Sequence, residues 1–242
     1  MKSLKECIIE SLLDDEDKVF DGAKENIIKE FLETNYKITG SYTIKETKNG
    51  FIVDVKGNVI VKNENIVTLT NEFFKFGEVS GDFNCYYCRY LTSLKGAPKK
   101  VGGYFFCNYC SSLTSLEGVP EKVGQSFYCG ECNSLTSLEG APKEVGRDFD
   151  CQLCDNLKSL EGAPRKVGWD FNCFSCKSLT SLKGAPQKVR GNFNCEYCKS
   201  LKTLEGAPEK VGENFNCRGC GIKFSTEDVK KYTKVSGLIL VV

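Results

Sequence analysis

The segment Phe105-Phe106-Cys107-Asn108-Tyr109-Cys110-Ser111-Ser112-Leu113-Thr114-Ser115-Leu116-Glu117-Gly118-Val119-Pro120-Glu121-Lys122-Val123 recurs, with small changes, along more than half of the chain. Its Phe-x-Cys-x-x-Cys pattern returns every 22 residues, with the first cysteines at Cys85, Cys107, Cys129, Cys151, Cys173, Cys195 and Cys217. All six prolines keep the same step. A period held over this many units is typical of a solenoid, in which each repeat forms one coil and packs on the next.

The periodicity inside one repeat predicts the shape of a coil. Phe105 and Cys107 alternate at period two, so both side chains point inward from one face of a short strand. Leu113 and Leu116 then turn the chain and add two more core positions. The Gly-x-Pro step that follows ends strand pairing, because proline has no backbone N–H to donate. The valine three residues after each proline closes the core before the next strand.

The repeat resembles the leucine-rich-repeat-like units of tailed bacteriophages and gut bacteria, and its Cys-x-Ser-Leu-Thr-Ser segment is similar to one in bacterial surface antigens. The resemblance covers residues 81–220. It implies that an Asn or Cys near the end of each strand bonds to the backbone inside the turn, a place held here by the second cysteine of each pair, such as Cys110.

Four regions follow from these patterns. We expect an α/β N-terminal cap, then a parallel β-rich, leucine-rich-repeat-like solenoid of about seven 22-residue coils, and a C-terminal helix-strand cap. The predicted boundaries are 1–58 for the N-terminal cap, 59–80 for a degenerate capping repeat, 81–220 for the solenoid and 221–242 for the C-terminal cap.

Local patterns predict the elements of the N-terminal cap. Ser3-x-x-Glu6 forms a capping box for a first helix, and Asp21 can cap a second helix with Ile27, Ile28, Phe31 and Leu32 on one face. Asn49-Gly50 suits a tight turn between two strands of alternating pattern.

The C-terminal cap carries weaker signals. Ser225 or Thr226 can cap a short helix that runs through Lys231. Leu238 and Leu240 then repeat the inward alternation of Phe-x-Cys. We therefore expect this region to cover the last apolar face of the solenoid, which would otherwise invite aggregation.

Composition excludes several classes of function. The 242 residues include 33 basic and 32 acidic side chains and no histidine, so neither a Ser-His-Asp triad nor a two-cysteine, two-histidine zinc finger is possible. The near-neutral charge argues against a nucleic-acid partner, and no apolar segment is long enough for a membrane partner. Neither a Walker A nor a dinucleotide fingerprint is present, so we expect neither an enzyme nor a cofactor.

The cysteines admit two interpretations. Fourteen of the 15 form Cys-x-x-Cys pairs, the spacing of four-cysteine zinc sites, so zinc bound by Cys85, Cys88, Cys107 and Cys110 is one alternative. Stacked coils would instead place the sulfurs in two continuous columns, where cysteine serves as a small buried residue. The odd count and the absence of a targeting signal favour reduced thiols and a cytoplasmic location, that of the host if the protein is phage-encoded.

The outward strand positions vary from coil to coil and carry the functional prediction. Exposed aromatic residues beside acids and amides are what protein interfaces use as anchors. We therefore expect a protein partner on a non-enzymatic interaction surface, with the candidate contact residues Tyr104, Phe106, Tyr128, Asp148, Asp150, Trp169 and Asp170. The competing interpretation is ordinary strand chemistry, in which aromatic residues suit strands and Asn stacks as a ladder.

Three alternatives stay open. Asp148, Asp150 and Asp170 could crowd together and attract a hard cation, or be mistaken for the carboxylate pair of a glycosidase. A lysine column after the prolines and a glutamate column after the second leucines would offset each other's charge, with phosphate or RNA binding as the minor reading. The segment Ile8-Ile9-Glu10-Ser11 resembles a cleaved leader of phage head proteins, which would make the protein a virion component.

Overall fold

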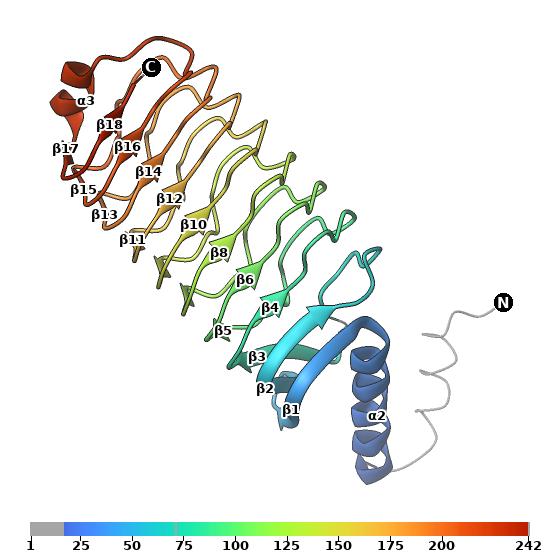
Figure 1. Ribbon diagram of the computed structural model, residues 1–242. Helices are drawn as coiled ribbons and strands as arrows, with labels where there is room; N and C mark the ends of the chain where they lie inside the picture. Colours follow the sequence, from blue (N-terminus) through green and yellow to red (C-terminus); the bar gives the residue numbers. More distant parts are fainter. Residues whose placement is uncertain (1–16, 71, 242) are drawn as a thin grey trace.

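The computed structural model describes residues 17–70 and 72–241. These residues form an elongated parallel β-solenoid, with α2 at its N-terminal end and α3 at its C-terminal end (Figure 1). The N-terminal part comprises α2 (Asp17–Asn35), β1 (Tyr36–Thr47), β2 (Gly50–Val61) and β3 (Phe74–Val79). The C-terminal part comprises α3 (Thr226–Tyr232), β17 (Lys234–Val235) and β18 (Ile239–Leu240).

Two rows of two-residue strands run along the solenoid between these ends. One row carries the phenylalanine of each repeat: β4 (Phe83–Asn84), β6 (Phe105–Phe106), β8 (Phe127–Tyr128), β10 (Phe149–Asp150), β12 (Phe171–Asn172), β14 (Phe193–Asn194) and β16 (Phe215–Asn216). The other carries the valine: β5 (Lys100–Val101), β7 (Lys122–Val123), β9 (Glu144–Val145), β11 (Lys166–Val167), β13 (Lys188–Val189) and β15 (Lys210–Val211).

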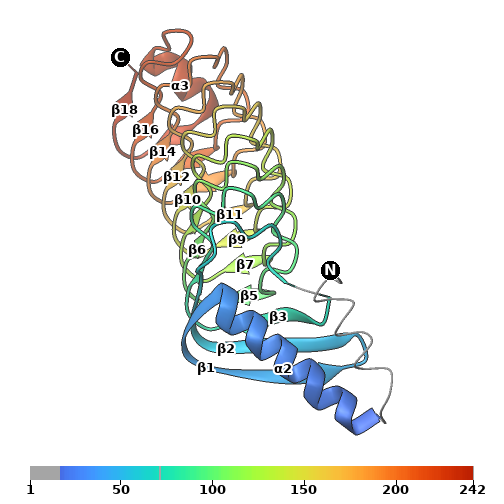
Figure 2. The same cartoon turned by 90° about the vertical axis from the view of Figure 1, so that its right-hand side faces the viewer.

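Each strand pairs in parallel with the equivalent strand of the next coil. Phe149 lies opposite Phe127 on one side and Phe171 on the other, and Val167 lies opposite Val145 and Val189. The phenylalanine row extends from the second half of β2 to β18, which gives about nine turns where the sequence predicted about seven repeats. Figure 2 shows the stack from the side.

The core contains the side chains that the repeat pattern placed inward. Phe149, Cys151, Cys154, Leu157 and Leu160 are fully buried, as are their equivalents in the neighbouring coils. The phenylalanine rings stack along the solenoid axis, with centroids 5.1–5.6 Å apart from Phe83 to Phe215. The predicted solenoid fold is therefore confirmed.

The second cysteine of each pair bonds to backbone, as the resemblance implied. Cys154 Sγ donates to the carbonyl oxygen of Cys129 at 3.3 Å, across to the preceding coil. The same bond joins Cys110 to Cys85 and Cys132 to Cys107. It also joins Cys176 to Cys151, Cys198 to Cys173 and Cys220 to Cys195.

The N-terminal cap departs from the expectation at one boundary. Helix α2 already includes Asp17, so the prediction that Asp21 caps it is wrong. Helix formation is cooperative, and no proline interrupts residues 17–21, so the helix extends past an acceptable cap residue. The expected helix that begins near Ser3 lies outside the described residues.

The predicted hairpin is present between β1 and β2. Thr47 pairs with Gly50, so Lys48 and Asn49 form the loop, one residue earlier than Asn49-Gly50. Strand β2 then continues into the first coil, where Val59 lies opposite Phe83. Val59, Ile66 and Leu69 are buried, so this degenerate coil continues the core.

At the C-terminal end, Ser225 caps α3 through a capping box with Asp228. The sequence predicted either Ser225 or Thr226 as the cap. The predicted register of the last strand is wrong. Ile239 lies opposite Phe215, so Ile239 takes the inward position and Leu238 is 66% exposed. Phe215 and Ile239 are 24 residues apart, because α3 lengthens the final connection beyond the 22-residue step.

Each coil has a residue in left-handed backbone conformation between its two cysteines. Six of these residues are not glycine, with φ between 55° and 66°: Tyr87, Tyr109, Glu131, Leu153, Ser175 and Tyr197. Gly219 holds the same position in the last cysteine-containing coil, at φ 59°. A side chain in this conformation costs about 1–2 kcal/mol, which a glycine avoids.

Replacing Ser175 by glycine is therefore expected to stabilise the protein. Relief of the left-handed strain, partly offset by the greater freedom of glycine in the unfolded chain, should raise the free energy of unfolding by about 1 kcal/mol and Tm by about 2–4 °C. Thermal unfolding followed by circular dichroism measures the shift. The matched change Gly219→Ala should lower Tm, and a fall in Tm for Ser175→Gly would contradict the argument.

Among the described residues, no helix combines the length and apolar character needed to cross a bilayer.

Candidate partner-binding face

The phenylalanine row carries two lines of outward side chains, one on each side of the buried ring. We call the residue before each phenylalanine the first outward column: Asp82, Tyr104, Ser126, Asp148, Asp170, Asn192 and Asn214. The residue after each phenylalanine forms the second outward column: Asn84, Phe106, Tyr128, Asp150, Asn172, Asn194 and Asn216. The members of both columns are half-buried, except for the buried Ser126.

Most members of the first outward column hold adjacent coils together. The Oδ1 atom of Asp148 accepts a hydrogen bond from the backbone N–H of Asp170 at 3.2 Å, and Oδ1 of Asp170 accepts one from the N–H of Asn192 at 2.6 Å. The pattern begins at Asn58 and ends at Asn214, which accepts from the N–H of Leu238. The ladder of short polar side chains that the sequence suggested is therefore present.

The second outward column serves the turn that follows it. Oδ1 of Asp150 accepts a hydrogen bond from the backbone N–H of Gln152, at 2.9 Å. The same contact with the residue two positions on is made by Asn84, Asn172, Asn194 and Asn216. Such side-chain-to-backbone bonds fix turns, so an Asp or Asn at this position has a structural reason.

Tyr104, Phe106 and Tyr128 interrupt both columns. No ring can supply the short acceptor that Asp or Asn provides in the other coils. The three rings instead stack on one another, with centroids 5.7 Å apart for Tyr104 and Phe106, 5.2 Å for Phe106 and Tyr128, and 6.4 Å for Tyr104 and Tyr128. We call these three residues the strand aromatic cluster. Sequence reasoning named all three, and the structure brings them together.

A second group of aromatic residues lies in the turns of the same coils, and sequence reasoning did not single it out. Tyr86, Tyr87 and Tyr109 have ring centroids 5.1–5.6 Å apart, and the Arg89 guanidinium lies 4.1 Å from the centroid of Tyr87. A hydrogen bond with Glu131 raises the pKa of Tyr109 to about 12. The signal was the tyrosine content between the cysteines of the first two pairs.

The two groups share one side of the solenoid. Glu196 lies two residues after Asn194, a member of the second outward column, and its carboxylate accepts a hydrogen bond from Nδ2 of Asn216 in the next coil at 2.9 Å. A residue at this position of a coil therefore lies beside the second outward column. Tyr86 holds this position in its coil and is 47% exposed. Both aromatic groups therefore lie on the same side of the first three cysteine-containing coils.

The candidate aspartates lie together in the next coils. Asp148, Asp150 and Asp170 line a shallow hollow of about 330 Å³ with Tyr128. Burial raises the pKa of Asp150, and the Asp148 carboxylate adds to the rise, while hydrogen bonds from Gln152 and Asn172 lower it. Among the described residues, no group of three or more Cys, Asp or Glu side chains is arranged to hold a metal ion. The three carboxylates each accept a backbone hydrogen bond within the stack.

Trp169 lies apart from the strand aromatic cluster. It precedes β12, two coils beyond Tyr128, or about 10 Å along the axis at the usual strand spacing. Its ring lies over Gly191 of the next coil, with Cδ1 3.2 Å from where a Cβ would stand. Trp169 is 47% exposed and contacts no other aromatic ring among the described residues. It adds a separate exposed aromatic residue to the same long solenoid.

The cysteine columns have the character of packing residues. Thirteen of the 14 cysteines of the repeats are buried, and all 14 are free. Burial is the largest cause that raises the pKa values of Cys107, Cys129, Cys132 and Cys154, and it raises that of Cys88 to about 12. Cys110 Sγ donates to the carbonyl oxygen of Cys85 at 3.2 Å, a contact that suits packing residues and favours that interpretation over Cys85, Cys88, Cys107 and Cys110 as a zinc site.

Comparisons of the chain with protein-family models, with curated proteins and with solved structures give no match.

Proposed function

We propose that this protein is a non-enzymatic interaction module that binds a protein partner through the aromatic surface of its first three cysteine-containing coils. The observation that carries the proposal is the replacement of Asp, Asn or Ser by Tyr104, Phe106 and Tyr128. In the other coils these positions supply hydrogen bonds that hold the stack and its turns. Tyr104, Phe106 and Tyr128 cannot form those hydrogen bonds, so a role in binding explains their presence better than a role in the fold.

The surface has the composition of a protein interface. Tyrosine, tryptophan and arginine are the residues that most often dominate binding energy, and here five tyrosines, a phenylalanine and Arg89 lie on neighbouring coils. The hollow that holds Asp148, Asp150 and Asp170 borders Tyr128. Carboxylates at the edge of an aromatic patch set the orientation of a partner more than its affinity. We therefore propose that the partner carries an apolar patch with basic residues beside it.

The repeat pattern and the reduced thiols support two finer assignments within this proposal. The 22-residue Phe-x-Cys-x-x-Cys unit supports membership of the leucine-rich-repeat-like solenoids of phages and gut bacteria. Buried free cysteines suit the reducing cytoplasm, of the host in a phage setting. The proposed leader cleavage before Ser11, on which a virion role depends, lies outside the described residues.

Photo-crosslinking tests the proposed surface. A photoreactive phenylalanine analogue at position 104 replaces one ring with another and should form one discrete adduct in extracts of cells that contain the partner. The same analogue at Tyr197, an exposed aromatic residue of a distant turn, is the control. An adduct from position 104 that is missing from position 197 supports the proposal. Identical adducts from both positions, or none from position 104, would overturn it.

A further inference from the structure

A basic hollow lies at the C-terminal end of the valine row, away from the aromatic surface. It has a volume of about 450 Å³ and is lined by Lys188, Glu209, Lys210, Lys230, Lys231, Tyr232, Thr233 and Lys234. Five lysines and one glutamate give the lining an excess of four positive charges. The whole chain has a net charge of only +1, so this concentration is local.

The lysines of this hollow end a column that is neutralised elsewhere. The outward residue of each strand in the valine row runs Glu78, Lys100, Lys122, Glu144, Lys166, Lys188, Lys210 and Lys234 along the solenoid. Glutamates of the same column pair with its first lysines, at 3.3 Å for Lys100 and Glu78 and at 2.6 Å for Lys166 and Glu144. The expected neutralisation by the separate glutamate column is therefore wrong for these lysines.

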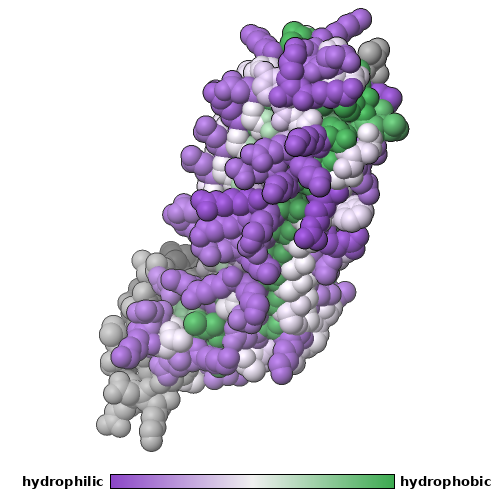
Figure 3. Space-filling model, turned by 90° about the vertical axis from the view of Figure 1, so that its left-hand side faces the viewer, coloured by the Kyte–Doolittle hydropathy of each residue, from purple (hydrophilic) through white to green (hydrophobic). Residues whose placement is uncertain are grey.

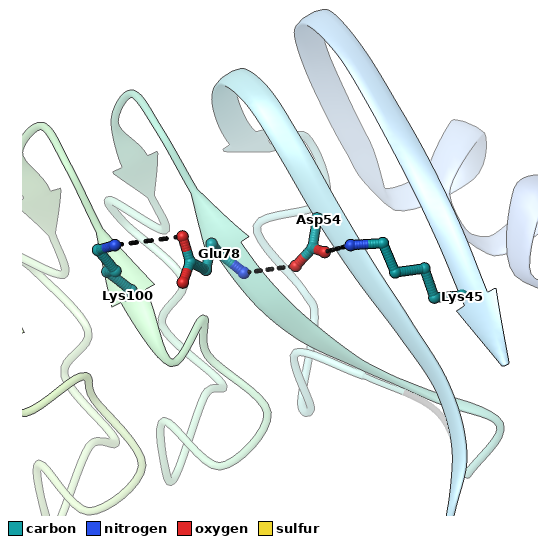
Figure 4. A network of polar contacts seen from close by, with 4 residues as sticks. All are labelled: Lys45, Asp54, Glu78 and Lys100. Atoms are coloured by element: carbon teal, nitrogen blue, oxygen red, sulfur yellow. Dashed lines mark hydrogen bonds and ion pairs between the residues drawn. The ribbon is translucent and has the colours of Figure 1, made fainter. Parts of the chain in front are cut away.

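Figure 4 shows the neutralised end of this column. The Asp54 carboxylate accepts hydrogen bonds from Lys45 Nζ at 2.6 Å and from the backbone N–H of Glu78 at 2.9 Å, and Lys100 Nζ bonds to Glu78. Two lysines and two carboxylates lie side by side from β1 to β5, and each lysine pairs with one carboxylate. Opposite charges on neighbouring strands stabilise the sheet slightly.

The other end of the column has like charges on adjacent coils. Lys210 lies directly opposite Lys188 and Lys234 in the parallel register. Adjacent strands are about 4.8 Å apart, so these ammonium groups repel one another. None of the three forms an ion pair with another described residue. Lys100, Lys122 and Lys166 earlier in the column each pair with a glutamate, whereas no ion pair among the described residues offsets the repulsion between the last three lysines.

Helix α3 explains only part of the charge. Lys230 and Lys231 lie in its last turn, where cations stabilise the negative end of the helix dipole, and Lys231 bonds to Asp228 at 2.8 Å. Lys188, Lys210 and Lys234 belong to the solenoid and gain nothing from that dipole. The helix closes one side of the hollow, so the two sets of lysines converge on the same space.

We infer that this hollow binds a compact polyanion with two or more phosphoryl groups. Lysine ammonium groups bind phosphate as point charges, and a regular row of three matches an anion whose charges follow one another closely. Bound phosphoryl groups would replace the repulsion between the lysines with attraction. Lys166, on the coil before Lys188, pairs with Glu144, which limits the run of unpaired lysines to the length of a small anion and disfavours an extended nucleic acid.

The test measures binding of tripolyphosphate by isothermal titration calorimetry at low ionic strength (about 10 mM salt, where screening is weak). The triple variant Lys188→Gln/Lys210→Gln/Lys234→Gln should bind about tenfold or more weakly than the unmodified protein. The control Lys100→Gln/Lys122→Gln/Lys166→Gln removes the same charge from the neutralised end of the column and should bind normally. Equal losses in both variants, or no binding by the unmodified protein, would overturn the inference.

A single variant separates binding from stability. Lys210→Glu places a carboxylate between Lys188 and Lys234, so it should raise Tm while it weakens tripolyphosphate binding. A fall in Tm would contradict the repulsion argument, and unchanged binding would contradict the site. Single-stranded RNA serves as the competing probe. Tighter binding of RNA than of tripolyphosphate at equal phosphate concentration would show that the surface takes an extended nucleic acid instead.

Discussion

Replacing Phe149 by alanine should lower the free energy of unfolding by about 3–5 kcal/mol and Tm by about 10 °C. Phe149 is fully buried and stacks between Phe127 and Phe171, with centroids 5.6 Å and 5.3 Å away. Its removal leaves a cavity in the middle of the ring column, and both neighbouring coils lose contacts. Rigid strand pairing on either side prevents the coils from closing the gap. The loss in the free energy of unfolding should therefore be among the largest for substitutions of this kind.

The matched control for this variant is Ile239→Ala. Ile239 holds the phenylalanine position in the last coil, where it is half-buried and has one neighbour, Phe215. In a solenoid each coil is stabilised by its neighbours, so an end coil contributes about half the contacts of an interior one. Chemical denaturation should show a loss of stability less than half that of Phe149→Ala. Equal losses would mean that the stacked ring column does not hold the coils together.

Replacing Phe106 and Tyr128, the two aromatic residues of the second outward column, by asparagine should abolish partner binding and leave the fold intact. In Phe106→Asn/Tyr128→Asn, asparagine takes the positions where Asn172, Asn194 and Asn216 bond to their turns. The variant thus loses a ring stack worth about 0.5–1.5 kcal/mol and regains two hydrogen bonds worth about 1 kcal/mol each. Tm should change by less than about 4 °C, because the two effects offset each other.

The expected loss of affinity for the crosslinked partner is about 100-fold or more, because buried aromatic anchors contribute about 2 kcal/mol or more each. Calorimetry with the identified partner measures the loss, and Tyr197→Asn removes an exposed ring from a distant coil as the control. Unchanged affinity in the double variant would exclude the strand aromatic cluster as the interface. A Tm that falls by more than about 10 °C would show that the rings serve the fold.

The proposed protein-binding surface and the polyanion site lie on different rows and at opposite ends of the solenoid. Figure 3 shows one long side of the molecule as mainly hydrophilic, with a narrow apolar strip along the stack and an apolar patch toward the C-terminal end. Leu238 is 66% exposed at that end, and Ile239 and Leu240 are half-buried. The C-terminal cap therefore covers the last coil less completely than the sequence analysis expected.

The 22-residue period was enough to predict the solenoid and its core. In a repeat that stacks on copies of itself, an inward residue in one coil is inward in all, so Phe149, Cys154 and Leu157 could be assigned from spacing alone. The prediction of inward residues was wrong in the last coil, where the spacing departs from 22 residues. The step from Phe215 to Ile239 contains α3, and only the observed pairing shows that Ile239, and not Leu238, faces the core.

The outward positions required the tertiary structure. The sequence does not show whether the side chain of a strand asparagine bonds to the next coil. The backbone N–H that donates to Asn192 Oδ1, for example, belongs to Asn214, 22 residues away. The structure shows that Asp148, Asp170 and Asn192 form hydrogen bonds between coils. Against that pattern, Tyr104, Phe106 and Tyr128 stand out as outward residues that cannot form such bonds. It also placed Lys188, Lys210 and Lys234 on adjacent coils without a counter-charge. The core follows from a periodicity within the chain, whereas these surfaces depend on which residues the stack makes neighbours.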